Sequence, residues 1–255
     1  MLKKILRINR EEGVIGFYQR IRFRVFLIIK PKTVKSAYGV WLNSNWGDAT
    51  FNLCLTGTYG YFFSNFLEKI KYKCDFIDIG ANQGLYSLIA GNNRNFINIY
   101  AIEPVNPTFR LLKKNIKLNN CKNIKLIESA ISSKNGYKNI FLEKNHSGAS
   151  TLNPKHTNAY NDNLKIKTIN YLRLNRLIKG ERKLIIKIDV EGHEKIVINQ
   201  LIKSNFFKRI DHIFLEVDNS YVDIKATLSK FKKLGFKKFK KTSKIKTHYD
   251  ILISR

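Results

Sequence analysis

The fold class is decided by one stretch of sequence, Asp75-Phe76-Ile77-Asp78-Ile79-Gly80-Ala81-Asn82-Gln83-Gly84. Its apolar residues predict a short buried strand that runs into a glycine turn, with a helix starting near Leu85. The next apolar run, residues 98–102, predicts a second strand and leads to Glu103. This order indicates a nucleoside-binding half-fold, because glycines let the backbone approach a ligand and the carboxylate can accept both ribose hydroxyls.

The spacing of the glycines separates this turn from a dinucleotide-binding turn. A dinucleotide turn reads Gly-x-Gly-x-x-Gly and places a pyrophosphate at the helix N-terminus. Here the pattern is Gly80-x-x-x-Gly84, and Asn82 stands where the second glycine would be. The turn therefore favours a ligand with an amino-acid end and one nucleoside, such as S-adenosylmethionine. The alternative is a tight strand-to-helix connection that binds nothing.

Length and composition indicate one main domain with an extension. The chain has 255 residues, of which 44% are hydrophobic, enough for a full core. We expect a basic helical extension over residues 1–50 and a cofactor-binding domain over residues 51–255. No apolar run is long enough to span a bilayer, and charged residues interrupt any secretory signal, so we expect a cytoplasmic protein. The three cysteines have no paired spacing and predict no zinc or redox site.

The net charge of +28 is concentrated at the two ends of the chain. Such basicity is typical of proteins that bind nucleic acid or anionic membranes. An A/T-biased genome, rich in Lys, Asn and Ile codons, would also produce it, and we favour that explanation. The first thirty residues have helical apolar spacing and form either a membrane-surface element or a helix packed on the domain. We favour the packed helix and keep peripheral contact with an anionic membrane as the alternative. We do not expect nucleic acid as a partner.

Beyond residue 75, strands alternate with helices, which predicts an α/β fold with helices on both faces of a mostly parallel sheet. The last two strands, near residues 236–240 and 249–253, should pair antiparallel and close the sheet. Ligands of open parallel sheets bind beyond the carboxyl ends of the strands. Of nineteen acidic residues, seven follow such strand ends: Glu103, Glu128, Asp189, Glu191, Glu194, Glu216 and Asp218.

Each strand end offers residues with a plausible role in binding. Asp78 can orient the glycine turn or, through water, the ammonium of a methionine moiety. Ser129 and Ala130 are placed to border an adenine ring.

Methyl transfer from sulfur to a hydroxyl needs positioning and a base. The base candidates are Asp189, Glu191 and His193, and Asp189 is also expected to contact the cofactor. Glu194 is either catalytic or a cap of the following helix. Carboxylates at neighbouring strand ends suit hard cations, but no spacing is diagnostic and we assign no metal.

Five ordered motifs over roughly residues 50–254 make the chain resemble the FkbM-type S-adenosylmethionine-dependent methyltransferases. The resemblance implies a class I methyltransferase (Rossmann-like) fold, a three-layer sandwich with a seven-stranded sheet whose last strand is antiparallel. It also implies O-methylation of sugars or of carbon skeletons. The motifs are Phe76-Ile77-Asp78-Ile79-Gly80-Ala81-Asn82-Gln83-Gly84, Ala101-Ile102-Glu103-Pro104, Leu112-x-x-Asn115-x-x-x-Asn119, Glu128-Ser129-Ala130-Ile131 and Lys187-Ile188-Asp189-Val190-Glu191-Gly192-His193-Glu194.

These observations predict an O-methyltransferase that uses S-adenosylmethionine and acts on a hydroxyl of a sugar, glycan or glycan precursor. We expect Gly80, Asn82, Gly84 and Glu103 to bind the cofactor and Asp189 and Glu191 to lie near the acceptor. The alternatives are an RNA ribose methyltransferase and a non-catalytic module that binds anionic membrane or polymer. Asn170 stands where the family often has Asp, which either changes an acceptor contact or preserves a helix cap.

Overall fold

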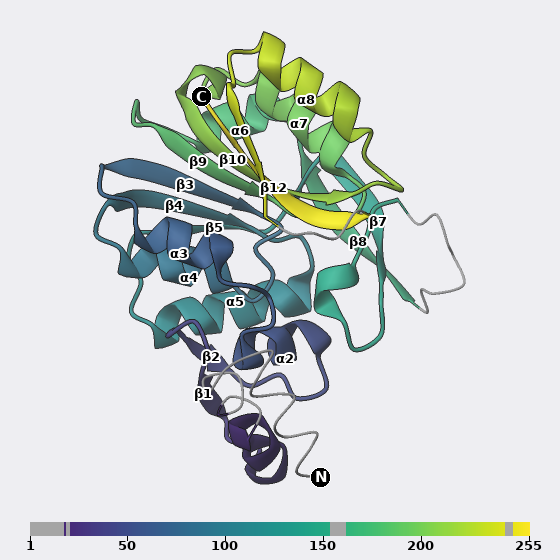
Figure 1. The fold of residues 1–255 in the computed structure, drawn as a ribbon. Helices are drawn as coiled ribbons and strands as arrows, with labels where there is room; N and C mark the ends of the chain where they lie inside the picture. The colour runs from purple at the N-terminus through teal and green to yellow at the C-terminus, as the bar shows by residue number, and fades with distance from the viewer. Residues whose placement is uncertain (1–17, 19–20, 154–161, 243–246) are drawn as a thin grey trace.

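The computed structural model describes residues 18, 21–153, 162–242 and 247–255 (Figure 1). Seven strands form the main sheet in the order β11, β12, β10, β9, β3, β4, β5. Strand β12 runs antiparallel to both of its neighbours, and the other adjacent pairs are parallel, which confirms the expected topology. The strands are β3 (Cys74–Ile79), β4 (Phe96–Ile102), β5 (Ile124–Ile127), β9 (Leu184–Ile188), β10 (Ile210–Asp218), β11 (Lys238–Lys241) and β12 (His248–Ser254).

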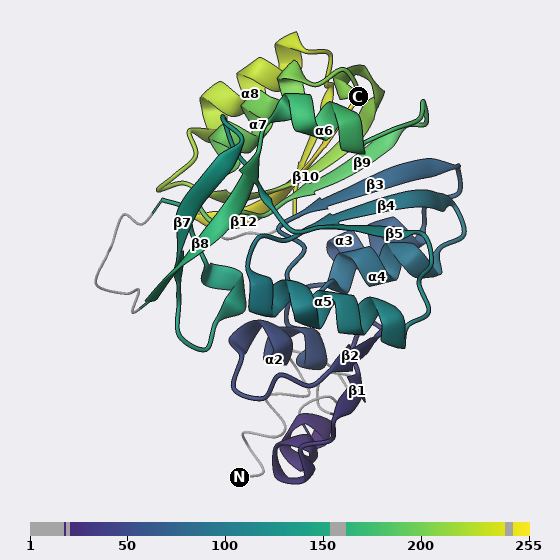
Figure 2. The ribbon, with the colours of Figure 1, turned by 180° about the vertical axis from the view of Figure 1, so that it is seen from behind.

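Helices cover both faces of this sheet, as Figures 1 and 2 show. Side chains of β3 alternate between the two faces, so that Phe76 belongs to one buried core and Ile77 to the other. Burial on both faces explains why the strands are continuous apolar runs. One face carries α3 (Phe62–Glu68), α4 (Leu85–Asn92) and α5 (Asn106–Leu118), and the other carries α6 (Tyr171–Leu177), α7 (Glu194–Lys203) and α8 (Ile224–Lys233).

A second sheet occupies the long connection after β5 (Figure 2). It consists of β6 (Ala130–Ile131), β7 (Gly136–Leu142) and β8 (Asp162–Ile169), with β7 and β8 antiparallel. Part of the connection is therefore additional strand. Its buried residues Ala130, Ile140 and Ile166 form a small core with Val105, which follows the carboxyl end of β4. The second sheet is thereby fixed beside the edge where ligands are expected.

The hairpin of β1 (Thr33–Lys35) and β2 (Trp41–Asn43) packs into the main fold, and α2 (Ala49–Thr56) follows it. Asn115 of α5 and Asn119, the C-cap of this helix, bind the β2 backbone: Asn119 accepts from Trp41 N at 2.9 Å and Asn115 from Asn43 N at 2.7 Å. Residues 33–50 therefore belong to the body of the fold, ahead of the boundary expected at residue 51.

Of the helical segment expected over the first thirty residues, the structure describes a helical stretch at residues 21–29. The part of the segment before residue 18 lies outside the described residues. Within the described ranges, no helix combines the length and apolar character needed to cross a membrane.

Candidate active site

The glycine turn after β3 brings three strand ends together. Gly80 has φ +77°, and a Cβ there would lie 1.8 Å from the backbone oxygen of Asp189 at the end of β9. The backbone N–H groups of Gly80 and Ala81 both donate to the carbonyl of Ile102 at 3.0 Å, which ties the turn to β4. A side chain at residue 80 would push these strand ends apart, so this glycine is required by the close approach of backbones.

Glu103 is held rigidly at the end of β4. Its Oε2 accepts from the backbone N–H of Asn82 at 2.9 Å, and its Oε1 accepts from that of Val105 at 2.9 Å. Burial raises the pKa of Glu103 to about 7, although both backbone donors act in the opposite direction. A carboxylate has about four lone-pair sites, so positions remain free to accept two ribose hydroxyls.

A cavity of about 640 Å³, here called the cofactor cavity, runs along this edge. It contains the residues expected to contact cofactor or methyl group, with the exception of two discussed below. Those that line it are Gly80, Asn82, Glu103, Ser129, Ala130, Asp189, Glu191 and His193. Its other walls are largely apolar and include Ile140 and Leu152, contributed by or next to the second sheet.

Two expected cofactor residues support the cavity without lining it. Gly84 caps α4 with φ +94°, and a Cβ there would lie 2.5 Å from Cδ1 of Leu112 in α5. Asp78 is buried beneath the turn, where its Oδ2 accepts from the Ser87 hydroxyl at 2.7 Å. Gly84 therefore allows helix packing, and Asp78 fixes the turn from below.

Lys187, in the middle of β9, is a site residue to which sequence reasoning assigned no role. Its ammonium lies 2.8 Å from Asp189 Oδ2 and 3.9 Å from Asp78 Oδ1, and it donates to the Gly80 carbonyl at 3.3 Å. Burial would lower the pKa of Lys187, but the two carboxylates raise it above its usual value, so the lysine stays charged. A lysine inside the apolar run Leu184-Ile185-Ile186-Lys187-Ile188 was the available signal.

A second, more open cavity of about 1470 Å³ adjoins the first and is here called the acceptor cavity. The two share Tyr59, Gly148, Asp189 and Glu191 as walls. Among the charged residues that line the acceptor cavity, carboxylates outnumber basic side chains, in contrast to the basic chain as a whole. They are Glu143, Asp189, Glu191, Glu216, Asp218 and Asp250, accompanied by Lys187, His146 and His248.

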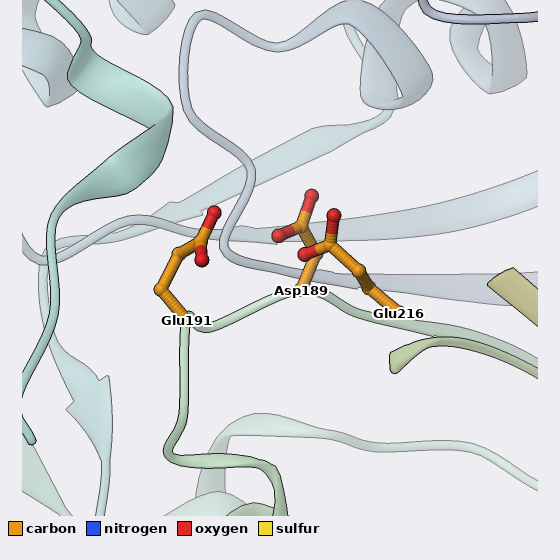
Figure 3. Close-up of side chains that lie close together, drawn as sticks. All are labelled: Asp189, Glu191 and Glu216. Atoms are coloured by element: carbon orange, nitrogen blue, oxygen red, sulfur yellow. The ribbon is translucent and has the colours of Figure 1, made fainter. Parts of the chain in front are cut away.

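Three of these carboxylates form a close group, shown in Figure 3: Asp189 and Glu216 lie side by side, with Glu191 on the following turn. One oxygen from each lies within 4.8 Å of the others. Burial would raise the pKa of Asp189, but Lys187 and a hydrogen bond from Glu216 hold it below its usual value. Burial, with the charge of Asp189, raises the pKa of Glu216 well above its usual range. Glu216 is therefore the protonated donor and Asp189 the ionised acceptor of this pair.

Glu191 differs from both, because burial and the neighbouring charge of Asp189 raise its pKa to about 8. It follows β9 with φ +47°, a conformation that side chains other than glycine adopt infrequently. Asp189 is a poor base because its negative charge is already satisfied. Glu191, which borders both cavities, has the affinity for a proton that a base needs.

The remaining strand-end residues fall outside the acceptor cavity. Glu194, the first residue of α7, accepts from the backbone N–H of Gly192 at 2.9 Å, in the turn before the helix. Glu128 accepts from Asn106 Nδ2 at 2.5 Å and lines a separate depression. His193, one of the base candidates, lines the cofactor cavity but not the acceptor cavity. Asn170 caps α6, accepting from Arg173 N at 3.3 Å.

The strand order, the glycine turn and the Glu103 carboxylate together define a class I S-adenosylmethionine-dependent methyltransferase. The pattern of the methyltransferase FkbM domain matches residues 78–238, so the chain belongs to the FkbM methyltransferase family, whose members use S-adenosylmethionine. No functionally curated protein matches the chain in sequence.

Solved structures are similar in fold at low sequence identity. The METTL16 methyltransferase domain has 13% identity and TM-score 0.49, covering 96% of this chain and 94% of that one. SMU.1697c of Streptococcus mutans, a putative methyltransferase bound to SAH, has 13% identity and TM-score 0.47, covering 75% and 94%. The complex of aTrm5 with tRNALeu has 17% identity and TM-score 0.48, covering 87% of this chain and 51% of that one. This chain thus spans about half of the aTrm5 chain.

Proposed function

We propose that this methyltransferase transfers its methyl group to a hydroxyl of a sugar, glycan or glycan precursor, in polysaccharide biosynthesis. The observation that carries the proposal is the acidic acceptor cavity beside the cofactor cavity. Carboxylates accept hydrogen bonds from hydroxyl groups and repel phosphates. A polyhydroxylated acceptor without phosphate near the reacting hydroxyl suits this lining best.

Glu191 is the proposed base. It borders both cavities, so a hydroxyl that approaches the cofactor sulfur from the acceptor cavity passes this carboxylate. The oxygen attacks the methyl carbon in line with the carbon–sulfur bond, the bonding pair remains on sulfur, and Glu191 takes the hydroxyl proton. The products are the methyl ether and S-adenosylhomocysteine. Asp189, kept ionised beside Lys187, supports the positive sulfonium electrostatically.

RNA is the second candidate acceptor, because the net charge of +28 would attract a polyanion. The acidic lining of the acceptor cavity opposes it, since a ribose between two phosphates would bring negative charge beside Asp189 and Asp218. Ribose methylation is therefore the less favoured outcome of the same experiment.

The exposed face of helix 21–29 supports a peripheral membrane location for a cytoplasmic enzyme. Phe23 and Phe26 pack against the main core. On another face, Ile21, Val25 and Ile28 are 48%, 43% and 84% exposed. Their spacing of four and three residues places them on one stripe of the helix.

Basic residues accompany this stripe, since Arg24 and Lys30 are exposed on the same segment. An apolar stripe with basic neighbours suits the interface of an anionic bilayer. We expect co-sedimentation with phosphatidylglycerol vesicles, reduced in Ile28→Ser and unchanged in Leu172→Ser, which alters an exposed residue of α6. Equal sedimentation of both variants with wild type would contradict a membrane role for the helix.

The acceptor is tested by transfer of labelled methyl from S-adenosylmethionine to three panels: neutral oligosaccharides, sugar phosphates and RNA. We expect label in an alkali-stable ether of a neutral glycan and its loss in Glu191→Gln. Label in RNA, at a ribose whose linkage then resists alkaline hydrolysis, would indicate 2′-O-methylation. That result would overturn the glycan proposal in favour of RNA.

A further inference from the structure

His193 has a ring nitrogen without a partner at the apolar end of the cofactor cavity. The residue is 5% exposed, and its Nε2 is buried with no hydrogen-bond partner among the described residues. A buried polar atom left unpaired costs about 1–3 kcal/mol, so such atoms usually have a partner in the functional state. The position of this nitrogen in a ligand cavity suggests that the partner belongs to the ligand.

The chemistry of Nε2 follows from the other ring nitrogen. The Ile131 backbone acts on the ring in the direction that raises the pKa of His193, as a carbonyl that faces a ring N–H does. Because Nε2 is unpaired, Nδ1 is the nitrogen that donates. Burial, followed by the charge of Lys138, lowers the pKa of His193 to about 4, so the ring is neutral at pH 7. In a neutral ring with Nδ1 protonated, Nε2 carries a lone pair and can only accept.

The surroundings of His193 suit a flat, apolar ring with a polar edge. The cavity that His193 lines has Ile131, Ile140, Leu152 and Val190 among its apolar walls. Glu103 fixes the ribose position in the same cavity. An adenine attached to that ribose and directed toward β6 would enter this apolar part.

The other carboxylate expected at this edge, Glu128, lies outside the cofactor cavity. It accepts from Asn106 and lines a separate depression. The Ser129 hydroxyl donates to the Glu128 carbonyl at 2.6 Å.

We propose that His193 Nε2 accepts a hydrogen bond from the exocyclic amine of adenine and so selects the base of the cofactor. This assignment replaces a catalytic role for His193 with a binding role. It rests on the use of S-adenosylmethionine and does not depend on which acceptor is methylated.

The test compares S-adenosylhomocysteine with its deaminated analogue, S-inosylhomocysteine, by calorimetry at pH 7.5. Hypoxanthine, the base of the analogue, has a carbonyl oxygen where adenine has the amine. That oxygen and the Nε2 lone pair are both acceptors, so no hydrogen bond can form between them. We expect wild type to prefer the adenosyl compound by roughly tenfold or more, the loss typical of an unmade buried hydrogen bond. In His193→Phe, which keeps a flat ring without the acceptor, the preference should fall to within about threefold. Glu128→Gln is the matched control and should retain the preference.

Two results would overturn the proposal: equal binding of both compounds by wild type, or full preference retained in a folded His193→Phe. A second measurement uses only the wild-type protein and so does not depend on whether His193→Phe folds. Nitrogen-15 shifts of the histidine ring should show Nε2 unprotonated, with a resonance that moves when S-adenosylhomocysteine binds. A protonated Nε2, or a resonance unmoved by saturating ligand, would contradict the assignment.

Discussion

Glu191→Gln should remove the pH dependence of methyl transfer. With a pKa of about 8, Glu191 is about 1% ionised at pH 6 and about 90% ionised at pH 9, so the rate should rise by up to about ninety-fold over this range. A carboxylate with an ordinary pKa would be ionised throughout and give a flat profile. The sulfonium charge of bound cofactor favours the ionised form, so the inflection should lie no higher than about pH 8.

The assay is kcat/KM for the acceptor at saturating S-adenosylmethionine, which removes the separate titration of Glu103 from the profile. We expect Glu191→Gln to lose the inflection and about a hundredfold or more in rate, the usual contribution of a positioned base. Glu143→Gln removes the same charge from an exposed position of the acceptor cavity and should keep the inflection. A wild-type profile that is flat from pH 6 to 9, or a slope unchanged in Glu191→Gln, would refute the assignment of the base.

Three further predictions concern the framework of the site. Gly80→Ala should lower the melting temperature and abolish cofactor binding, whereas Gly39→Ala, at a similar φ of +80° but with nothing within 4 Å, should cost only the backbone strain of about 1–2 kcal/mol. Lys187→Met leaves two buried carboxylates without their counter-charge and should destabilise the fold by about 3–5 kcal/mol in urea unfolding; a change below 1 kcal/mol would contradict the buried ion pairs. Asp75→Ala should lower the free energy of unfolding by a similar amount, because this carboxylate is fully buried. Arg182→Ala, which removes an exposed partner of Asp75, should lower it by less than about 1 kcal/mol.

The strand–turn–strand core of the fold could be predicted because its signals are local. The apolar run of β3, the glycines and the strand end at Glu103 are adjacent in sequence, and burial on both faces makes the strands continuous apolar runs. The packing of the β1–β2 hairpin could not be predicted in this way. It depends on hydrogen bonds from Asn115 and Asn119, more than seventy residues away.

The candidate site shows the same division between local and distant signals. The strand-end rule correctly gathered Glu103, Asp189 and Glu191 at one edge, because parallel strands share that edge. The rule also placed Glu128 at this edge, but its side chain accepts a hydrogen bond from Asn106 and lines a separate depression. Lys187 was overlooked because a charge inside an apolar strand gives no indication of the carboxylates that will surround it.

Glu103, as the ribose-binding carboxylate, is the residue on which cofactor binding most directly depends. Calorimetric titration of wild type and Glu103→Gln with S-adenosylmethionine tests it, since the amide keeps the shape but loses the charge. We predict binding by wild type, weakened tenfold or more in the variant, and a wild-type affinity that falls as pH drops below about 7, where Glu103 becomes protonated. Unchanged affinity in a folded Glu103→Gln, or an affinity of wild type independent of pH between 5.5 and 8, would contradict the account.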